Sequence, residues 1–146
     1  MDKRISESLK SLIGRISLHE QETVAINFAL GDLLNSYVDC SAESATGASL
    51  KLDRDSGINY ALFLNYARIA RRIPEADRPK KVPWGAIKYI VSDLNPRRFR
   101  VNEERFVRAA VEALKEIERR DLKLVDLKVV SEGEWTIGEQ ILREFL

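Results

Sequence analysis

Apolar residues recur at helical spacing along most of this 146-residue chain. Residues 3–13 form a first apolar stripe, which Gly14 is predicted to interrupt. A longer helix is predicted over residues 17–39, because Ser17 and Glu20 have the spacing of a capping box. The apolar positions of these two segments are Ile5, Leu9, Leu12, Ile13, Val24, Ala25, Phe28, Leu30, Leu33, Leu34, Tyr37 and Val38. The longer segment is interpreted as the central core helix.

Turn and capping residues divide the middle of the chain. Residues 40–49 are small and polar and predict a loop, and the short helix after them should stop at Gly57, where a left-handed C-cap is normal. Asn59 is predicted to cap a further helix that runs to about Ile73, because Pro74 prevents its continuation.

More helical segments follow a proline-rich connection. Residues 84–94 predict one helix, and Asn102 is predicted to cap another that ends near Arg120. The tail has both strand and helix character over 122–130, and a final amphipathic helix is predicted over 134–146. The predicted inward positions of the first helix are Trp84, Ile87, Ile90, Val91 and Leu94. The apolar faces of the other two hold Phe106, Val107, Ala110, Val111, Leu114, Ile117, Trp135, Ile137, Ile141, Leu142 and Phe145.

The two helices on either side of Gly57 have the order of a helix-turn-helix, in which the second helix enters the major groove of DNA. Leu50 and Leu52 are predicted to anchor the first helix, and Ile58 to point inward behind the turn. On the second helix, the predicted buried face holds Leu62, Phe63, Tyr66, Ile69 and Ala70. The predicted outer face holds Asn59, Tyr60, Ala61, Leu64, Asn65, Arg68, Arg71 and Arg72.

Together these elements predict an all-α fold. Residues 1–100 are assigned to a compact multi-helix domain that contains the helix-turn-helix at about 48–73. Residues 101–146 are assigned to a C-terminal helical segment that docks on this domain or mediates dimerisation.

The charges are unevenly spread, although the net charge is only +1. Residues 68–100 hold ten Lys or Arg and three Asp or Glu, whereas the segments before and after carry an acidic excess. A basic middle between acidic flanks indicates polyanion binding, because phosphates attract clustered cations. The alternative interpretation is a solvated surface of mixed charge.

The outer face of the second helix carries groups that suit DNA. Asn65 can pair with adenine and Arg68 with guanine, while Tyr60 can reach a phosphate. Cations around that helix are predicted to contact the phosphates of the DNA backbone. The predicted DNA-binding residues are Asn59, Tyr60, Asn65, Arg68, Arg71, Arg72, Lys80, Lys81, Arg97 and Arg98.

Other classes of function lack their residues. The chain has one cysteine, Cys40, and one histidine, His19, so it cannot form the usual four-ligand zinc site. Neither residue lies in a nucleophile motif. Cys40 is expected to end a helix, and His19 to lie in the first turn of one. The acids form no recognisable catalytic motif, and no glycine-rich phosphate loop is present. We therefore expect no enzyme, no cofactor, no bound metal and no small-molecule substrate. The N-terminus lacks a secretory signal and no apolar run is long enough for the membrane, so a cytoplasmic protein is expected.

The segment GINYALFLNYARIARRIP resembles the recognition helix of helix-turn-helix proteins of bacterial phages and plasmids, particularly those of the actinobacterial type. The resemblance covers about residues 48–95, since VPWGAIKYIVSDL is similar to the helix that follows in such proteins. The matching positions are Gly57, Ile58, Asn65, Tyr66, Ala67, Ile69, Ala70, Arg71 and Pro74. It implies binding of double-stranded DNA, in a role in transcription, partition or recombination.

Two interpretations of function stay open. The first is a sequence-specific DNA-binding protein, a phage or plasmid regulator, which forms a homodimer if it follows the two-fold symmetry common among such proteins. The second is a helical protein–protein interaction module, such as a phage-encoded inhibitor of a host protein.

Overall fold

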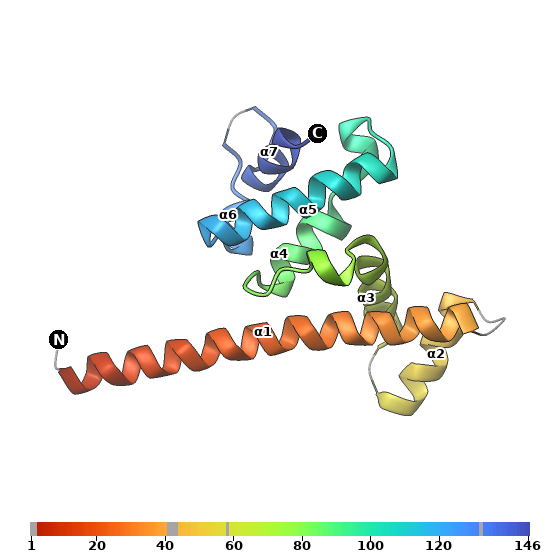
Figure 1. Ribbon diagram of the computed structural model, residues 1–146, viewed down its shortest axis with the longest axis horizontal. Coiled ribbons are helices and arrows are strands. Elements are labelled where there is room, and N and C mark those ends of the chain that lie inside the picture. Colours follow the sequence, from red (N-terminus) through yellow and green to blue (C-terminus); the bar gives the residue numbers. More distant parts are fainter. Residues whose placement is uncertain (1–2, 41–43, 58, 132) are drawn as a thin grey trace.

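The computed structural model describes residues 3–40, 44–57, 59–131 and 133–146, and this part of the chain is all-α, as predicted (Figure 1). The described residues form seven α-helices, which are joined by short 3-10 or π-helical turns and by loops. The α-helices are α1 (Lys3–Cys40), α2 (Ala45–Ser56), α3 (Tyr60–Arg72), α4 (Trp84–Lys88), α5 (Glu103–Arg120), α6 (Leu124–Leu127) and α7 (Ile137–Glu144). The other turns are η1 (Glu75–Asp77), η2 (Tyr89–Asp93) and η3 (Pro96–Phe99).

The N-terminal 38 residues of the described chain form one continuous helix, α1, and not the two that were predicted. Gly14 does not interrupt it, because a glycine inside a helix costs only about 1 kcal/mol relative to alanine. Ser17 and Glu20 therefore form no capping box, and His19 lies inside the helix, where its carbonyl accepts a hydrogen bond from Thr23 Oγ1 at 2.9 Å. The prediction that Cys40 ends a helix is confirmed.

The turn between α2 and α3 has the predicted local geometry. Gly57 adopts a left-handed conformation with φ of 75°, and the Asn59 side chain accepts a hydrogen bond from the backbone N–H of Ala61 at 2.8 Å. Ile58, predicted to point inward, lies outside the described residues. The first helix starts earlier than predicted, since Ser44 caps α2 by accepting from the Gly47 N–H at 3.1 Å.

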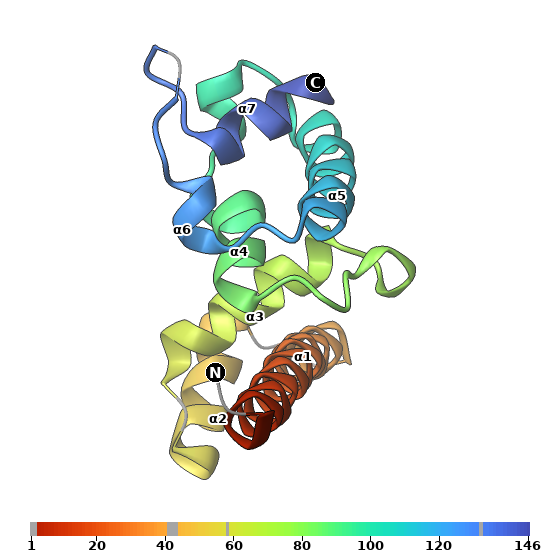
Figure 2. The same ribbon diagram turned by 90° about the vertical axis from the view of Figure 1, so that its left-hand side faces the viewer.

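Two apolar cores meet at α3, which lies between the lower and upper groups of helices (Figure 2). The smaller core joins α1, α2 and α3, and its buried members are Leu34, Ala48, Phe63 and Ala67. The larger core joins Val24 and Phe28 of α1, and Ile69, Ala70 and Ile73 from the end of α3, to the C-terminal helices. Of the residues predicted to line the central helix, Leu33 and Tyr37 are exposed, so α1 buries only one side.

The helix α4 continues directly into the π-helical turn η2, and together they form the middle of the larger core. Ile87, Ile90, Val91 and Leu94 are buried, as predicted. Trp84 is half-buried and packs edge-on against the rings of Phe28 and Tyr66, with centroids 5.3 and 5.4 Å away. Trp84 thus connects α1, α3 and α4.

The C-terminal helices complete the larger core. On α5 the predicted apolar face is buried, apart from the half-buried Val107, and Asn102 caps the helix. The final helix begins at Ile137, later than predicted, where Thr136 and Glu139 form a capping box. Ile141 and Leu142 are buried against α5 and η2. Apolar residues from both sides of position 100 therefore share one core.

Candidate nucleic-acid interface

The helix α3 keeps one side at the surface, and it is largely the predicted side. Ala61, Arg68 and Arg71 are exposed and Leu64 is half-buried, while Phe63 on the opposite face is buried. Asn59 and Tyr60 are exposed at the N-terminal end of this side. This outer face of α3 is the part of the predicted site that lies at the protein surface.

Two leucines that were predicted to pack inside the helix pair are exposed instead, so these two predictions are wrong. Leu62 is 47 % exposed because α3 enters the core only from Phe63 onward, one residue later than predicted. Leu50 is 43 % exposed because α2 begins at Ala45 and turns Ala48 and Ser49 inward instead. The side chain of Leu52, the other predicted anchor, lies outside the described part of the structure.

A carboxylate on α2 connects the two helices on either side of Gly57. The Oδ2 atom of Asp53 accepts a hydrogen bond from the backbone N–H of Tyr60 at 3.1 Å. A negative charge at the N-terminus of α3 satisfies an otherwise free N–H and favours the helix dipole. Asp53 therefore fixes the start of the outer face.

The prediction that Asn65, Arg68 and Arg72 project together into solvent is wrong for two of them. The Arg72 side chain is only 16 % exposed, because it forms an ion pair with Glu103 on α5 and a hydrogen bond to the Val91 carbonyl. Asn65 is half-buried and donates to Ser92 Oγ at 3.0 Å. These two side chains connect α3 to the C-terminal helices, and only Arg68 stays exposed.

Arg71 lies on the outer face but is not free. Its Nε donates to Asn35 Oδ1 at 2.9 Å, and its Nη2 forms an ion pair with Asp39 at 2.7 Å. Asn35 in turn donates to the Ala67 carbonyl at 3.0 Å. Because the guanidinium is about half exposed, the pair adds little stability by itself, but it directs Arg71 toward α1.

Arg98, another predicted DNA contact, also has an internal partner, although its side chain is 44 % exposed. Its guanidinium pairs with the buried carboxylate of Glu139 and lies 4.5 Å from the centre of the Trp135 ring. Burial raises the pKa of the Glu139 carboxyl, but the hydrogen bonds from the Thr136 backbone, Arg98 and the Thr136 hydroxyl outweigh it, so the net pKa is lowered. Glu139 is therefore held ionised beneath Arg98.

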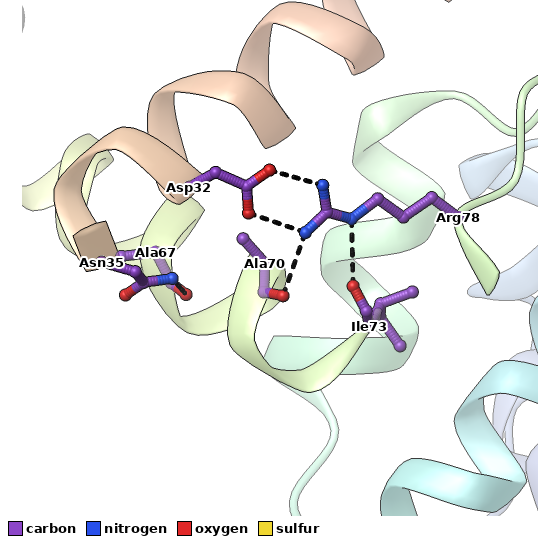
Figure 3. Close-up of polar contacts among 6 residues, drawn as sticks. All are labelled: Asp32, Asn35, Ala67, Ala70, Ile73 and Arg78. Atoms are coloured by element: carbon purple, nitrogen blue, oxygen red, sulfur yellow. Dashed lines mark hydrogen bonds and ion pairs between the residues drawn. The ribbon is translucent and has the colours of Figure 1, made fainter. Parts of the chain in front are cut away.

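Sequence reasoning missed the role of Arg78, which lies in the proline-rich connection. Its guanidinium donates to both carboxylate oxygens of Asp32 at 2.6 and 2.8 Å, and to the carbonyls of Ile73 and Ala70 at 3.0 and 3.2 Å (Figure 3). It lies 4.5 Å from the centre of the Phe28 ring. Arg78 thus holds α1 against the end of α3 with a fork-shaped donor that lysine cannot imitate.

These pairs change the interpretation of the basic middle segment. Five of its ten cations form ion pairs, namely Arg71, Arg72, Arg78, Lys88 and Arg98. For four of the five, the carboxylate partner lies in one of the acidic flanks. The uneven distribution of charge along the sequence therefore serves, in large part, the packing of the flanks on the middle.

The predicted cations without a carboxylate partner in the described chain lie in two places. Arg68 and Arg97 line one groove of about 510 Å³, together with Arg72, Ser92, Asn95 and Glu103. Lys80 and Lys81 lie at the other end of α5, where their backbone N–H groups donate to Glu118 Oε2 at 3.1 and 2.9 Å. Because Glu103 and Glu118 are 15 residues apart on one helix, these two places are about 22 Å apart.

Among residues whose placement is described, no helix is long and apolar enough to cross a membrane. Nor do three His, Cys, Asp or Glu side chains come close enough there to hold a metal ion. Comparison with protein-family models, curated proteins and solved structures found no match to this chain.

Proposed function

We propose that this protein binds double-stranded DNA through the outer face of α3 and the adjoining groove, as a regulator of phage or plasmid transcription, partition or recombination. The observation that carries the proposal is the shared groove of Arg68 and Arg97, two guanidinium groups without a carboxylate partner in the described chain. Guanidinium groups bind phosphate and guanine with two parallel hydrogen bonds.

The surroundings of the groove favour an anionic ligand. Its two carboxylates are already neutralised, since Glu103 pairs with Arg72 at 2.9 Å and Asp93 with Lys88 at 3.6 Å. The positive charges of Arg68 and Arg97 are thus not cancelled within the groove. A DNA duplex placed there would gain one contact from each guanidinium without breaking an internal ion pair.

The outer face of α3 supports the same ligand. Ala61 and the half-buried Leu64 lie on this side with Arg68, and small apolar side chains there can contact a thymine methyl group. In this arrangement Arg68 is the residue that reads a base, and Arg97 contacts the backbone. Arg72 and Arg98 keep their internal partners and position the surface instead of touching DNA.

The test compares variants that each remove one positive charge. We expect Arg68→Gln to weaken binding of a selected duplex by about 1–3 kcal/mol and to relax sequence preference. We expect Arg97→Gln to weaken binding to every sequence and to flatten the salt dependence by about one phosphate contact. The control is Arg119→Gln, which removes an exposed guanidinium from the far end of α5.

Fluorescence anisotropy with labelled duplexes at several salt concentrations would measure all three variants. Equal affinity of the Arg68 and Arg97 variants and the Arg119 control would contradict the proposal.

A second function, protein–protein interaction, is favoured by a different observation. Large apolar residues on α1, including Ile5, Leu12 and Ile16, are exposed. An extended apolar surface of this kind marks an interface.

A further inference from the structure

The first half of α1 extends beyond the rest of the protein (Figure 1). All residues from 3 to 16 are exposed, apart from the half-exposed Ser6. A helical segment of this length without tertiary packing is only marginally stable in water, and Gly14 weakens it further. The extended half therefore lacks the packing that would normally stabilise it.

The exposed apolar residues of α1 follow a heptad repeat. From Ile5 to Tyr37 the spacings alternate between four and three residues without a break. The ten positions are Ile5, Leu9, Leu12, Ile16, His19, Thr23, Ile26, Leu30, Leu33 and Tyr37. Eight of them are apolar or aromatic, and seven of those eight are 40–60 % exposed. This alternation is the pattern of a two-stranded coiled-coil seam.

The heptad stripe is separate from the side of α1 that packs on the body of the protein. The body side is buried at Val24, Phe28, Gly31 and Leu34, and none of these belongs to the ten stripe positions. Of the stripe positions, only Thr23 and Leu30 are half-buried beside the body, and the other eight are exposed. A second helix can lie along its whole length, which is about 50 Å.

We propose that this stripe pairs with the same stripe of a second copy, in a parallel and in-register coiled coil. Charge complementarity favours this occupant and this direction. Arg15 and Glu20 flank the stripe at the g position of one heptad and the e position of the next. In a parallel dimer, Arg15 therefore lies opposite Glu20 of the partner subunit, and the two-fold axis repeats the pair. Both side chains are exposed and form no ion pair within the described chain.

The polar layer in the middle of the stripe supports the same register. His19 and Thr23 interrupt the apolar positions, and among parallel arrangements only the in-register one places each opposite its own copy and keeps the apolar layers together. The C-terminal tail does not compete as an interface, because Ile141 and Leu142 are buried in the protein's own core. The inference does not rest on DNA binding.

Sedimentation equilibrium of the full chain over a range of concentrations tests the dimer. We expect the unchanged protein to dimerise, and Leu12→Glu to raise the dimer dissociation constant at least tenfold, because it places two carboxylates in an apolar layer. The matched control is Leu18→Glu, an exposed leucine of the same helix that lies outside the stripe. We expect this control to dimerise like the unchanged protein. Leu12 is itself exposed, so the substitution leaves the core intact.

Direction is tested by oxidation of Leu12→Cys in a Cys40→Ser background. A parallel, in-register pair brings the two position-12 thiols together, so a disulfide-linked dimer is expected, and Leu18→Cys should not form one. A chain that stays monomeric at all concentrations would overturn the proposal and assign the stripe to a different protein. A dimer that resists Leu12→Glu, or one that Leu12→Cys does not cross-link, would also overturn it.

Discussion

The crossing of α1 over α3 depends on a glycine that leaves no room for a side chain. A Cβ at Gly31 would lie 2.3 Å from the carbonyl oxygen of Tyr66, 2.6 Å from its carbonyl carbon and 2.9 Å from the Ala70 Cβ. The two shortest contacts are to backbone atoms, so no rotamer change can relieve them. Gly31→Ala therefore forces the two helices apart.

Two opposing effects set the size of the loss. Alanine stabilises a helix interior by about 1 kcal/mol relative to glycine. Overpacking of a close contact costs about 1–3 kcal/mol, and a contact to the backbone belongs at or beyond the upper end of that range. We therefore expect a net loss of about 2 kcal/mol in the free energy of unfolding, which lowers the Tm of a chain of this length by about 4–8 °C.

Gly14→Ala is the matched control on the same helix, since a Cβ there meets no atom within 4 Å. It keeps the gain in helix propensity without the clash, so we expect unchanged or slightly increased stability. Urea unfolding followed by circular dichroism measures both variants. If Gly31→Ala proves as stable as Gly14→Ala, α1 and α3 do not cross as described.

Three further predictions concern particular side chains. Because the pKa of Glu139 is lowered from 4.5, its ionised form stabilises the protein near neutral pH, and that contribution is lost as the pH falls below about 4.5. Between pH 7 and pH 3, the urea midpoint of Glu139→Gln should therefore fall less steeply than that of the unchanged protein. Arg78→Lys should lower the free energy of unfolding by about 1–2 kcal/mol, because lysine keeps the charge but loses the paired donors, whereas Arg119→Lys at an exposed site should change it by less than about 0.5 kcal/mol. Thermal unfolding should show a loss of about 3–5 kcal/mol for Phe63→Ala and almost none for Leu62→Ala, and equal losses would refute the described rotation of α3.

Local signals in the sequence predicted the middle of the fold well. Gly57, Asn59 and Pro74 each act within a few residues of their own position, so the bounds and caps of α3 were predictable. The helical period also predicted which side of α3 is buried, because an amphipathic helix turns its apolar stripe to the core wherever it packs. These features need no knowledge of distant parts of the chain.

The same local signals failed where a longer pattern overruled them. Gly14 and Ser17 look like the end of one helix and the start of another, yet α1 runs through both. Apolar helical spacing continues on both sides of Gly14, and a cap is used only where the chain actually turns away. The heptad stripe proposed above gives a physical reason for that continuity.

The roles of the arginines were beyond the reach of sequence reasoning. Arg78 binds Asp32 across 46 residues, and Arg98 binds Glu139 across 41. A cluster of cations in the sequence looks the same whether it meets phosphate or internal carboxylates. Only the folded arrangement separates the paired arginines from Arg68 and Arg97.

The salt dependence of duplex DNA binding tests the proposed function most directly. Each neutralised phosphate lowers log K by about 0.9 per unit of log salt, so the Arg97 contact alone should contribute about −0.9 to the slope. The double variant Arg68→Gln, Arg97→Gln should lose about one unit of that slope. Absence of duplex binding at about 50 mM salt, or an affinity that salt does not change, would contradict the account.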